Sequence, residues 1–342
     1  MTGPQGMGPL IPATTSHPAT PIQIGAITPA GISGLTIHSI DYEPSTGLLV
    51  IVDSDAKAHT VDLASPTAPS LLQTQTLGQF RAVAITPGAS HFFVAHYNGD
   101  EWVRRYSLSN PAAFTASGQT DLAFASYGGG GREGYLVGNY FVYFAERGNQ
   151  MAVVDVTNPS AAVKMGLAGS STVFNGDTDS VFYGGYYYAQ GASSNSMGIA
   201  HVTAGVPALD ATIANTGTST RLDAAGTRLV TIGSSTSLKI WDLTAPIAPT
   251  QIGSTVNPAG SATAASLGTM TTFDDVALDP TGRYAYVCTN LGLLVLDCQT
   301  PTATVPASKV VPPSGNVVKT IERVADNRLI GVGTQNVRVY EI

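Results

Sequence analysis

One stretch of the chain, Lys239–Gly253, constrains the fold more than any other feature of the sequence. It reads Lys-Ile-Trp-Asp-Leu-Thr-Ala-Pro-Ile-Ala-Pro-Thr-Gln-Ile-Gly. A short apolar run ends at Asp242, two prolines follow at fixed offsets, and a second apolar run begins. Variants of this unit recur along the whole chain, and a recurrence at fixed spacing is the sequence signature of a repeat architecture.

The acidic or polar residue that closes the apolar run serves as an anchor for aligning the repeats. The seven anchors are Asp62, Ser107, Asp155, His201, Asp242, Asp297 and Glu341. They follow one another at 45, 48, 46, 41, 55 and 44 residues. A proline stands four positions after five of them, at Pro66, Pro111, Pro159, Pro246 and Pro301. The fourth repeat departs from this pattern, because Gly205 occupies the proline position.

Two further strand-like runs precede each anchor. In the first repeat they are Thr36–Tyr42 and Leu48–Asp53, and the segment between them contains Pro44 and Gly47, which favour a tight turn. A fourth run, such as Ser70–Thr76 or Thr250–Val256, follows the proline. No segment shows sustained helical periodicity. Each repeat therefore predicts four antiparallel strands.

Four short strands repeated at this spacing are typical of a β-propeller, in which each repeat is one blade. The seventh repeat stops after its third strand, at Ile342. The missing strand is found near the other end of the chain, because His17–Gly25 matches Ala245–Gly253 in two prolines, a glutamine, an isoleucine and a glycine. We therefore predict one seven-bladed propeller over residues 17–342. Residues 17–28 supply the outer strand of the last blade, and residues 1–16 form an extended arm.

The repeats resemble a known family. Val153-Val-Asp-Val-Thr-Asn-Pro159 and Ile240-Trp-Asp-Leu-Thr-Ala-Pro246 are similar to the repeat of the LVIVD propellers, which are related in layout to WD-repeat proteins. The resemblance covers nearly the whole chain after residue 17. Gln299 departs from it, since it stands where serine or threonine is expected. These motifs specify blades, and the family as a whole implies no single activity.

The charge content points to the kind of partner. Charged residues make up 11% of the chain, against roughly 25% in an average soluble domain. Residues 1–40 contain no charged side chain. We expect the arm to be held by another protein subunit through its apolar and proline residues, Pro4, Met7, Pro9, Leu10, Ile11 and Pro12. The net charge of −7 argues against nucleic acid as the partner.

The sequence also predicts where the protein acts. The first twelve residues lack the basic and apolar regions of a signal peptide, and the longest aliphatic run is Leu48–Val52. Such a run is far short of the ~20 residues that span a bilayer. We expect no export signal and no membrane insertion, and a location in a virion or another assembly, otherwise in the cytoplasm. Cys288 and Cys298 are predicted to lie roughly 13 Å apart along their strands, too far for a disulfide.

Several polar clusters suggest chemistry, and a simpler structural role fits each of them better. Gly128–Gly131 lacks the Lys-Ser/Thr of a phosphate loop. Asn175–Asp179 has alternating oxygen ligands but lacks the distal glutamate of a calcium loop. Asp53-Ser-Asp55 has the composition of a turn, and Asp274 and Asp275 are placed to face a central channel. We predict no catalytic residue, metal site or cofactor.

Tyrosines are concentrated in the third and fourth repeats. Aromatic faces and hydroxyl groups suit sugars or protein partners, although tyrosine also favours strands for packing reasons. The candidate binding residues are Tyr183, Tyr186, Tyr187 and Tyr188. Strand alternation requires that some of the last three point outward or between blades.

These observations favour a non-enzymatic structural propeller that binds other proteins in a larger assembly, such as a bacteriophage capsid or tail accessory or adhesion protein. One alternative is a carbohydrate-binding surface module that uses the tyrosines, with a glycan as the partner. A second alternative is a propeller enzyme in which acidic and basic residues from several blades meet in the channel.

Overall fold

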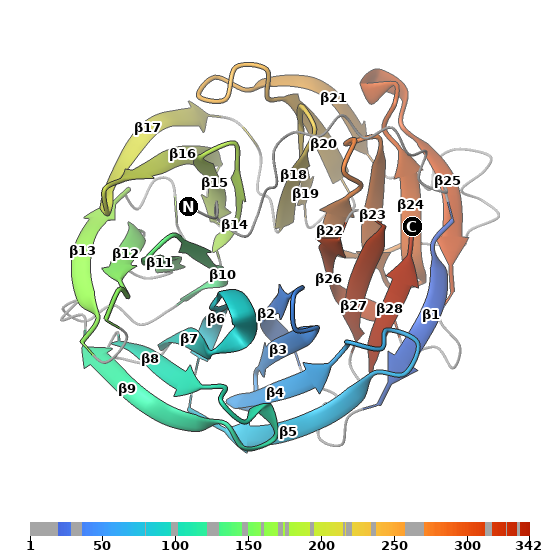
Figure 1. Ribbon diagram of the computed structural model, residues 1–342. Coiled ribbons are helices and arrows are strands. Elements are labelled where there is room, and N and C mark those ends of the chain that lie inside the picture. The colour runs from blue at the N-terminus through green and yellow to red at the C-terminus, as the bar shows by residue number, and fades with distance from the viewer. Residues whose placement is uncertain are drawn as a thin grey trace. The chain divides into compact units, whose positions relative to one another are not determined.

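The computed structural model describes residues 20–28, 36–78, 80–96, 102–121, 130–145, 150–158, 161–169, 174, 178–191, 195–214, 216, 221–233, 237–256, 270–311, 317–325, 327–333 and 336–342. They form an all-β propeller of seven blades, each a four-stranded antiparallel sheet (Figure 1). The contacts divide the chain into two compact units.

The first unit, Leu35–Thr216 with Met1–Gly8, holds blades 1 to 4. Blade 1 consists of β2 (Ile37–Glu43), β3 (Leu48–Asp53), β4 (Lys57–Asp62) and β5 (Ser70–Thr76). Blade 2 consists of β6 (Phe80–Ile85), β7 (His91–His96), β8 (Trp102–Ser107) and β9 (Thr115–Asp121), with short 3-10 turns η1 (Pro87–Ala89) and η2 (Pro111–Ala113). Blade 3 consists of β10 (Gly130–Val137), β11 (Tyr140–Ala145), β12 (Gln150–Asp155) and β13 (Val163–Ala168). Blade 4 consists of β14 (Thr178–Tyr183), β15 (Tyr186–Gly191), β16 (Ser196–Thr203) and β17 (Val206–Ala214).

The second unit, Gly217–Ile342 with Pro9–Gly34, holds blades 5 to 7. Blade 5 consists of β18 (Arg221–Ala225), β19 (Arg228–Gly233), β20 (Ser237–Asp242) and β21 (Thr250–Val256). Blade 6 consists of β22 (Phe273–Leu278), β23 (Tyr284–Thr289), β24 (Gly292–Asp297) and β25 (Val305–Val310), with the turn η4 (Pro301–Ala303). Blade 7 consists of β26 (Val318–Ala325), β27 (Arg328–Gly333), β28 (Val337–Glu341) and β1 (Ile22–Ile27).

The N-terminal strand β1 completes the last blade, as the repeat alignment predicts. It pairs antiparallel with β28, with Ile22 opposite Glu341 and Ile27 opposite Val337. In every blade except blade 4 the anchor likewise lies opposite the beginning of its outer strand, for example Asp62 opposite Ser70 and Asp242 opposite Thr250. The register therefore confirms both the alignment and the origin of the seventh outer strand.

The middle strands of each blade carry the core. All six residues of β3 and of β23 are buried, because each face of such a strand packs against other apolar side chains. One core cluster joins Val50 and Val52 of blade 1 to Phe92 and Phe114 of blade 2. Another joins Val230 and Ile240 of blade 5 to Val287 and Leu294 of blade 6. Strands buried on both faces read as continuous apolar runs, and this explains the strong sequence signal of the repeat.

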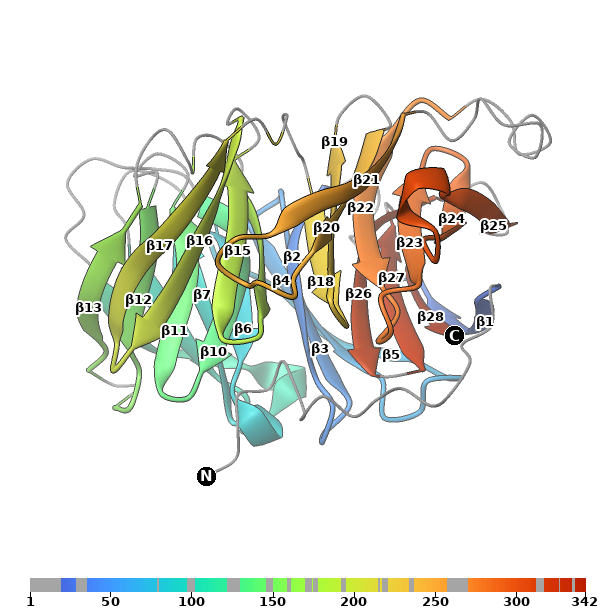
Figure 2. The same cartoon turned by 90° about the horizontal axis from the view of Figure 1, so that it is seen from above.

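Every outer strand carries a β-bulge at the same register. The bulged residues, each skipped in the pairing with the third strand, are Ile24, Leu72, Ser117, Met165, Asp210, Ile252 and Ala307. A bulge bends the strand, increases its twist and interrupts the row of free amides that an edge offers to another chain. Figure 2 shows the resulting sweep of β17 and β21 across their blades.

No helix among the described residues is long and apolar enough to cross a membrane.

Candidate functional site

The anchor aspartates hold the turn that follows the third strand. In blades 1, 3, 5 and 6 the anchor Oδ1 accepts a hydrogen bond of 2.8 Å from the backbone amide two residues later, at Ala64, Thr157, Thr244 and Gln299. A short carboxylate that bonds the backbone in this way stabilises a turn. The feature that defines the repeat is therefore structural.

The prolines that follow the anchors lie in tight turns, and in blades 2 and 6 the turn packs on the preceding blade. In blades 1 and 5, i→i+3 bonds of 2.9 Å run from Ala68 to Ser65 and from Ala248 to Ala245, around Pro66 and Pro246. The turn of blade 2 contacts blade 1, since Thr60 Oγ1 donates to the Pro111 carbonyl over 2.8 Å. The turn of blade 6 contacts blade 5 so closely that a Cβ on Gly253 would lie 2.0 Å from the Pro301 carbonyl oxygen.

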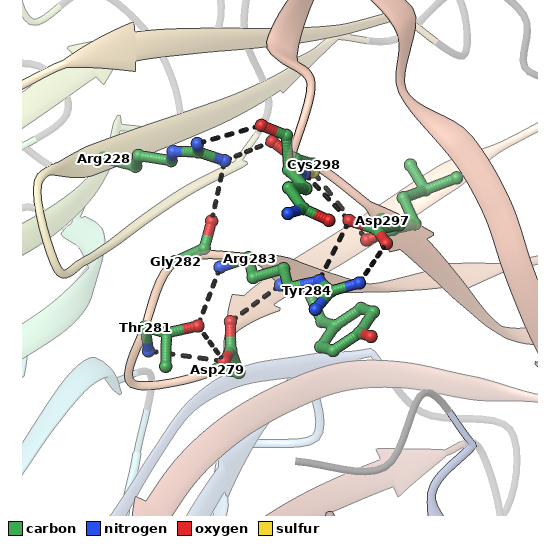
Figure 3. Close-up of polar contacts among 10 residues, drawn as sticks. Arg228, Asp279, Thr281, Gly282, Arg283, Tyr284, Asp297 and Cys298 are labelled. Atoms are coloured by element: carbon green, nitrogen blue, oxygen red, sulfur yellow. Dashed lines mark hydrogen bonds and ion pairs between the residues drawn. The ribbon is translucent and has the colours of Figure 1, made fainter. Parts of the chain in front are cut away.

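A second set of polar contacts joins blades 5 and 6 (Figure 3). Arg228 of β19 donates to the carbonyl oxygens of Gly282, Cys298 and Gln299. Below it, Arg283 pairs with the Asp297 carboxylate over 2.9 Å, and its guanidinium lies 4.8 Å from the centre of the Tyr284 ring. The bonds of Arg228 hold the hairpin ends of blade 6 against blade 5, whereas the contacts of Arg283 lie within blade 6.

Carboxylates on the first strands bridge to the next blade. Asp41 Oδ2 accepts from Ile85 N over 2.6 Å, and Asp223 Oδ2 accepts from Leu278 N over 2.7 Å. Burial raises the pKa of Asp41 to about 7, against the opposing effect of the amides of Ile85 and Tyr42. Burial likewise raises the pKa of Asp223 to about 6, opposed by the charge of Arg323. Both positions lie on the innermost strand of their blade.

Acidic and basic side chains do meet on the first strands of blades 5 to 7. Asp275 of β22 lies 3.6 Å from Arg221 of β18, and Asp274 lies 2.7 Å from Lys319 of β26. Asp275 also accepts from the amides of Val276 and Ile321, over 2.9 Å each. The Asp275 carboxylate thus accepts one amide from its own strand and one from blade 7, and it faces Arg221 of blade 5. This arrangement links three successive blades without requiring a substrate.

Asp53 has a different environment from the exposed turn that its sequence suggests. Its Oδ2 bonds His59 Nε2 over 2.8 Å, and His59 Nδ1 bonds Thr74 Oγ1 over 2.9 Å. The Asp53 and His59 side chains are both fully buried. Asp53 Oδ1 accepts from the amides of Asp55 and Lys57, so it also holds the turn as predicted. Since solvent does not reach the imidazole, the set stabilises blade 1.

Blade 4 departs from the other repeats where the sequence does. β16 and β17 are joined by the two residues Ala204 and Gly205, whose φ angles are +50° and +82°, with Thr203 opposite Val206. Positive φ at both central residues defines the type I′ hairpin turn. The third strand therefore continues past the anchor His201, which has no proline turn to hold.

His201 is instead paired with the bulged residue of the outer strand. Its Nδ1 lies 2.8 and 2.7 Å from the two carboxylate oxygens of Asp210. The side chains are 33% and 22% exposed, so the pair is accessible to solvent. The Tyr186 ring meets the His201 ring edge to face, with centroids 6.4 Å apart. Tyr183 lies directly opposite Tyr186 in the hairpin that precedes it.

The four candidate tyrosines divide between this surface and the interior. Tyr183 and Tyr186 are partly exposed. Tyr187 is 1% exposed, and its ring packs on Phe182, Tyr135 and Phe144 between blades 3 and 4. Tyr188 is fully buried. Of the four candidates, Tyr183 and Tyr186 thus reach the surface, and the predicted participation of Tyr187 and Tyr188 in a binding surface is corrected because both side chains are buried.

The remaining predicted features have mixed outcomes. The arm residues Pro4, Met7, Pro9, Leu10, Ile11 and Pro12 lie outside the described residues, as do Gly128 and Gly129 of the glycine run and Asn175–Asp177. Among the described residues no three histidine, cysteine or acidic side chains gather as a metal site. Cys288 and Cys298 are both buried and free, which confirms that they form no disulfide.

Sequence reasoning missed the pairing of His201 with Asp210. The two residues are nine positions apart, and only the bulge in β17 turns the carboxylate toward the imidazole. The available signal was the departure of the fourth repeat from the proline pattern, which marked this blade as different without naming the partner of His201.

No protein-family profile and no curated protein sequence matches this chain. Its fold, in contrast, is widespread, since 1517 chains of solved structures resemble it. One is the crystal structure of the β-propeller domain of Cps50 (Swd1) from Myceliophteria thermophila, with a TM-score of 0.66 and 13% sequence identity, covering 94% of this chain and 100% of that one. At this identity the likeness shows a β-propeller related in structure to that domain and nothing about activity.

Proposed function

We propose that this protein is a non-enzymatic interaction propeller that binds other protein subunits in a larger assembly. The observation that carries the proposal is an exposed apolar patch on the outer strands of blades 3 and 4. Its four members are Val163, Met165, Val206 and Leu209, exposed by 57%, 38%, 60% and 37%. β13 and β17, which supply them, lie side by side (Figure 1).

The two outer strands that carry these residues are in contact near the turn between β16 and β17. A Cβ on Gly205 would lie 2.9 Å from Met165 Cε, and a Cβ on Gly166 would lie 2.9 Å from Pro207 Cδ. Apolar side chains gathered at one place on a surface mark interaction sites, whereas singly scattered ones do not. Methionine is enriched in protein interfaces, where its flexible side chain adapts to a partner.

The occupant that fits the patch is the N-terminal arm of a second copy. The arm carries no charge over residues 1–16, and it contributes Met7, Leu10 and Ile11. An apolar segment of this kind buries its side chains on an apolar patch without desolvating a charge. The low charge of the whole chain, 11%, suits a protein whose surface is covered by neighbours. In its narrower form the proposal is a virion accessory or adhesion protein built on LVIVD-like repeats.

The propeller-enzyme alternative is supported less well. An enzyme of this kind would need acidic and basic side chains from several blades to meet, as they do at Asp274 and Asp275. The Asp275 carboxylate, however, accepts hydrogen bonds from two backbone amides. We therefore propose that these carboxylates hold blades together and that no reaction is catalysed.

Sedimentation velocity of the full chain over a range of concentrations tests the proposal. We expect self-association that is lost on deletion of residues 1–16 and equally lost in the double variant Met165→Glu, Val206→Glu. The matched control is Ile247→Glu, since Ile247 is 51% exposed in the turn of blade 5 and lies outside the patch. A full chain that stays monomeric, or a patch variant that associates like the wild type, contradicts the proposal.

A further inference from the structure

The surface of blade 4 also carries a polar and aromatic set of side chains that differs chemically from the apolar patch. Tyr183, Tyr186 and His201 come from the consecutive strands β14, β15 and β16, and Asp210 comes from β17. Tyr183 lies opposite Tyr186, the Tyr186 ring meets the His201 ring, and His201 bonds Asp210. The four side chains therefore form one row across the sheet.

The row exists because three local features coincide. The hairpin between β14 and β15 turns at Gly184 and Gly185, both exposed with φ of +61° and +88°, so Tyr183 and Tyr186 are brought opposite each other at its end. The I′ turn at Ala204 and Gly205 extends β16 beyond His201. The bulge in β17 then aims Asp210 at the imidazole.

The geometry fixes what the row offers to a ligand. Asp210 accepts the hydrogen on Nδ1, so Nε2 is the acceptor of the ring in its neutral form. Among the described residues Nε2 has no hydrogen-bond partner, and the His201 side chain is 33% exposed. The Asp210 carboxylate adds acceptor oxygens, and Tyr186 adds a partly exposed aromatic ring with a hydroxyl group.

An aromatic ring beside fixed hydrogen-bond acceptors suits a ligand with an apolar face and hydroxyl donors along its edge. We infer that this row binds a neutral pyranose sugar, with the C–H face of the ring on Tyr186 and hydroxyl groups donating to His201 Nε2 and Asp210. An anionic sugar is disfavoured, because the polar end of the row is a carboxylate. The inference goes beyond the proposed assembly function and does not depend on it.

Blade 6 has a similar surface pair that is not available to a ligand in the same way. Its anchor Asp297 also forms a surface pair, with Arg283, but Asp297 Oδ1 additionally accepts from Gln299 N and holds the turn. His201 makes no such backbone bond among the described residues, so its imidazole is available to a ligand.

The test uses saturation-transfer NMR of the full chain with the methyl pyranosides of glucose, galactose, mannose and N-acetylglucosamine, followed by calorimetric titration of the strongest binder. We expect signal transfer to at least one of the four. Asp210→Asn should weaken its binding about tenfold, as loss of a hydrogen bond to a charged group does. Tyr186→Ala should abolish it, whereas Tyr186→Phe, which keeps the ring, should lose less.

Asp297→Asn is the matched control, because it alters a comparable surface carboxylate of blade 6, and it should bind like the wild type. Asp210→Asn lies at the surface and tests the site even if Tyr186→Ala disturbs the hairpin. The inference is overturned if none of the four pyranosides shows transfer, or if Asp210→Asn and Tyr186→Ala bind as well as the wild type. Binding by a monomeric chain would support it whatever the fate of the assembly proposal.

Discussion

Blades 4 and 5 are consecutive copies of one four-strand unit, but they join their third and fourth strands differently. In blade 5 the anchor Asp242 caps the turn at Thr244, and Pro246 lies in the tight turn that follows. In blade 4 the same position is His201, the strands run on to a two-residue hairpin, and the imidazole pairs with Asp210. In blade 4 the hairpin turn replaces the proline turn, and the residue at the anchor position no longer caps a turn and can pair with another side chain.

The largest effect is expected from a side chain on Gly253 of blade 5, where the strand touches the proline turn of blade 6. The Cβ of Gly253→Ala would lie 2.0 Å from the Pro301 carbonyl oxygen, so the backbone of blade 5 or blade 6 must move. The corresponding residue of blade 4, Ala211, already carries a Cβ. We expect Gly253→Ala to lower the free energy of unfolding by about 3 kcal/mol, the upper range for overpacking.

Urea denaturation measures this loss, with Gly88→Ala as control. Gly88 has φ of +73° and open space around it, so its substitution should cost about 1 kcal/mol through backbone strain alone. Equal losses for the two variants would show that the contact with the turn of blade 6 is not tight.

The strand register of the propeller was predictable because the residues that define the repeat are buried residues of the middle strands. The strand order can be read from the sequence alone. The apolar run that forms the fully buried β23 marks a middle strand, and the match of the N-terminal segment to blade 5 identifies the last outer strand. The site was predictable only in part. Alternation indicates that Tyr186 and Tyr187 face opposite ways, but which one reaches solvent depends on Phe182 and Phe144, which cover Tyr187.

The bulge at Asp210 is the part that sequence reasoning could not supply. The same bulge position holds Ile252 in blade 5 and Met165 in blade 3, so no residue type marks it. Its effect on His201 arises from the local twist of the strand rather than from spacing along the chain.

The first strands of blades 4 and 5 differ in how pH should affect their stability. Asp223 of blade 5 has its pKa raised to about 6 by burial, whereas the corresponding residue of blade 4 is Val181. A raised native pKa means that the native state holds a proton that the unfolded chain, with a pKa of 3.8, has released. The resulting stability is complete below pH 3.8 and is lost as the pH rises through 6.

We therefore expect the contribution of Asp223 to fall by up to about 1.4 kcal/mol per pH unit between pH 4 and 6. Asp41, with its pKa raised to about 7, adds a loss of the same sign that extends to pH 7. Urea midpoints measured at several pH values should show a shallower slope for Asp223→Asn than for the wild type. An unchanged slope would mean that Asp223 is ionised in the native state.

Removing the anchor side chains of blades 4 and 5 compares the surface pair of His201 with the turn cap of Asp242. Asp242→Ala loses the 2.8 Å bond to Thr244 N and should cost about 1 kcal/mol, as loss of a capping side chain does. His201→Ala should cost less than about 0.5 kcal/mol, because its partner Asp210 is accessible to water. Thermal and urea unfolding of the two variants gives the difference, and equal costs would assign His201 a structural role as well.

The smallest effect is expected inside blade 4, at the tyrosine beside the proposed sugar site. The Tyr187 hydroxyl is buried and has no hydrogen-bond partner in the part of the chain that the structure describes. Tyr187→Phe removes a polar group that is desolvated without compensation, while the ring keeps its contacts with Phe182 and Tyr135. We expect the free energy of unfolding to rise by a few tenths and at most about 1 kcal/mol. Pyranoside binding should be unchanged, because the ring faces the interior, so a loss of binding in Tyr187→Phe would place the ligand between the blades rather than on their surface.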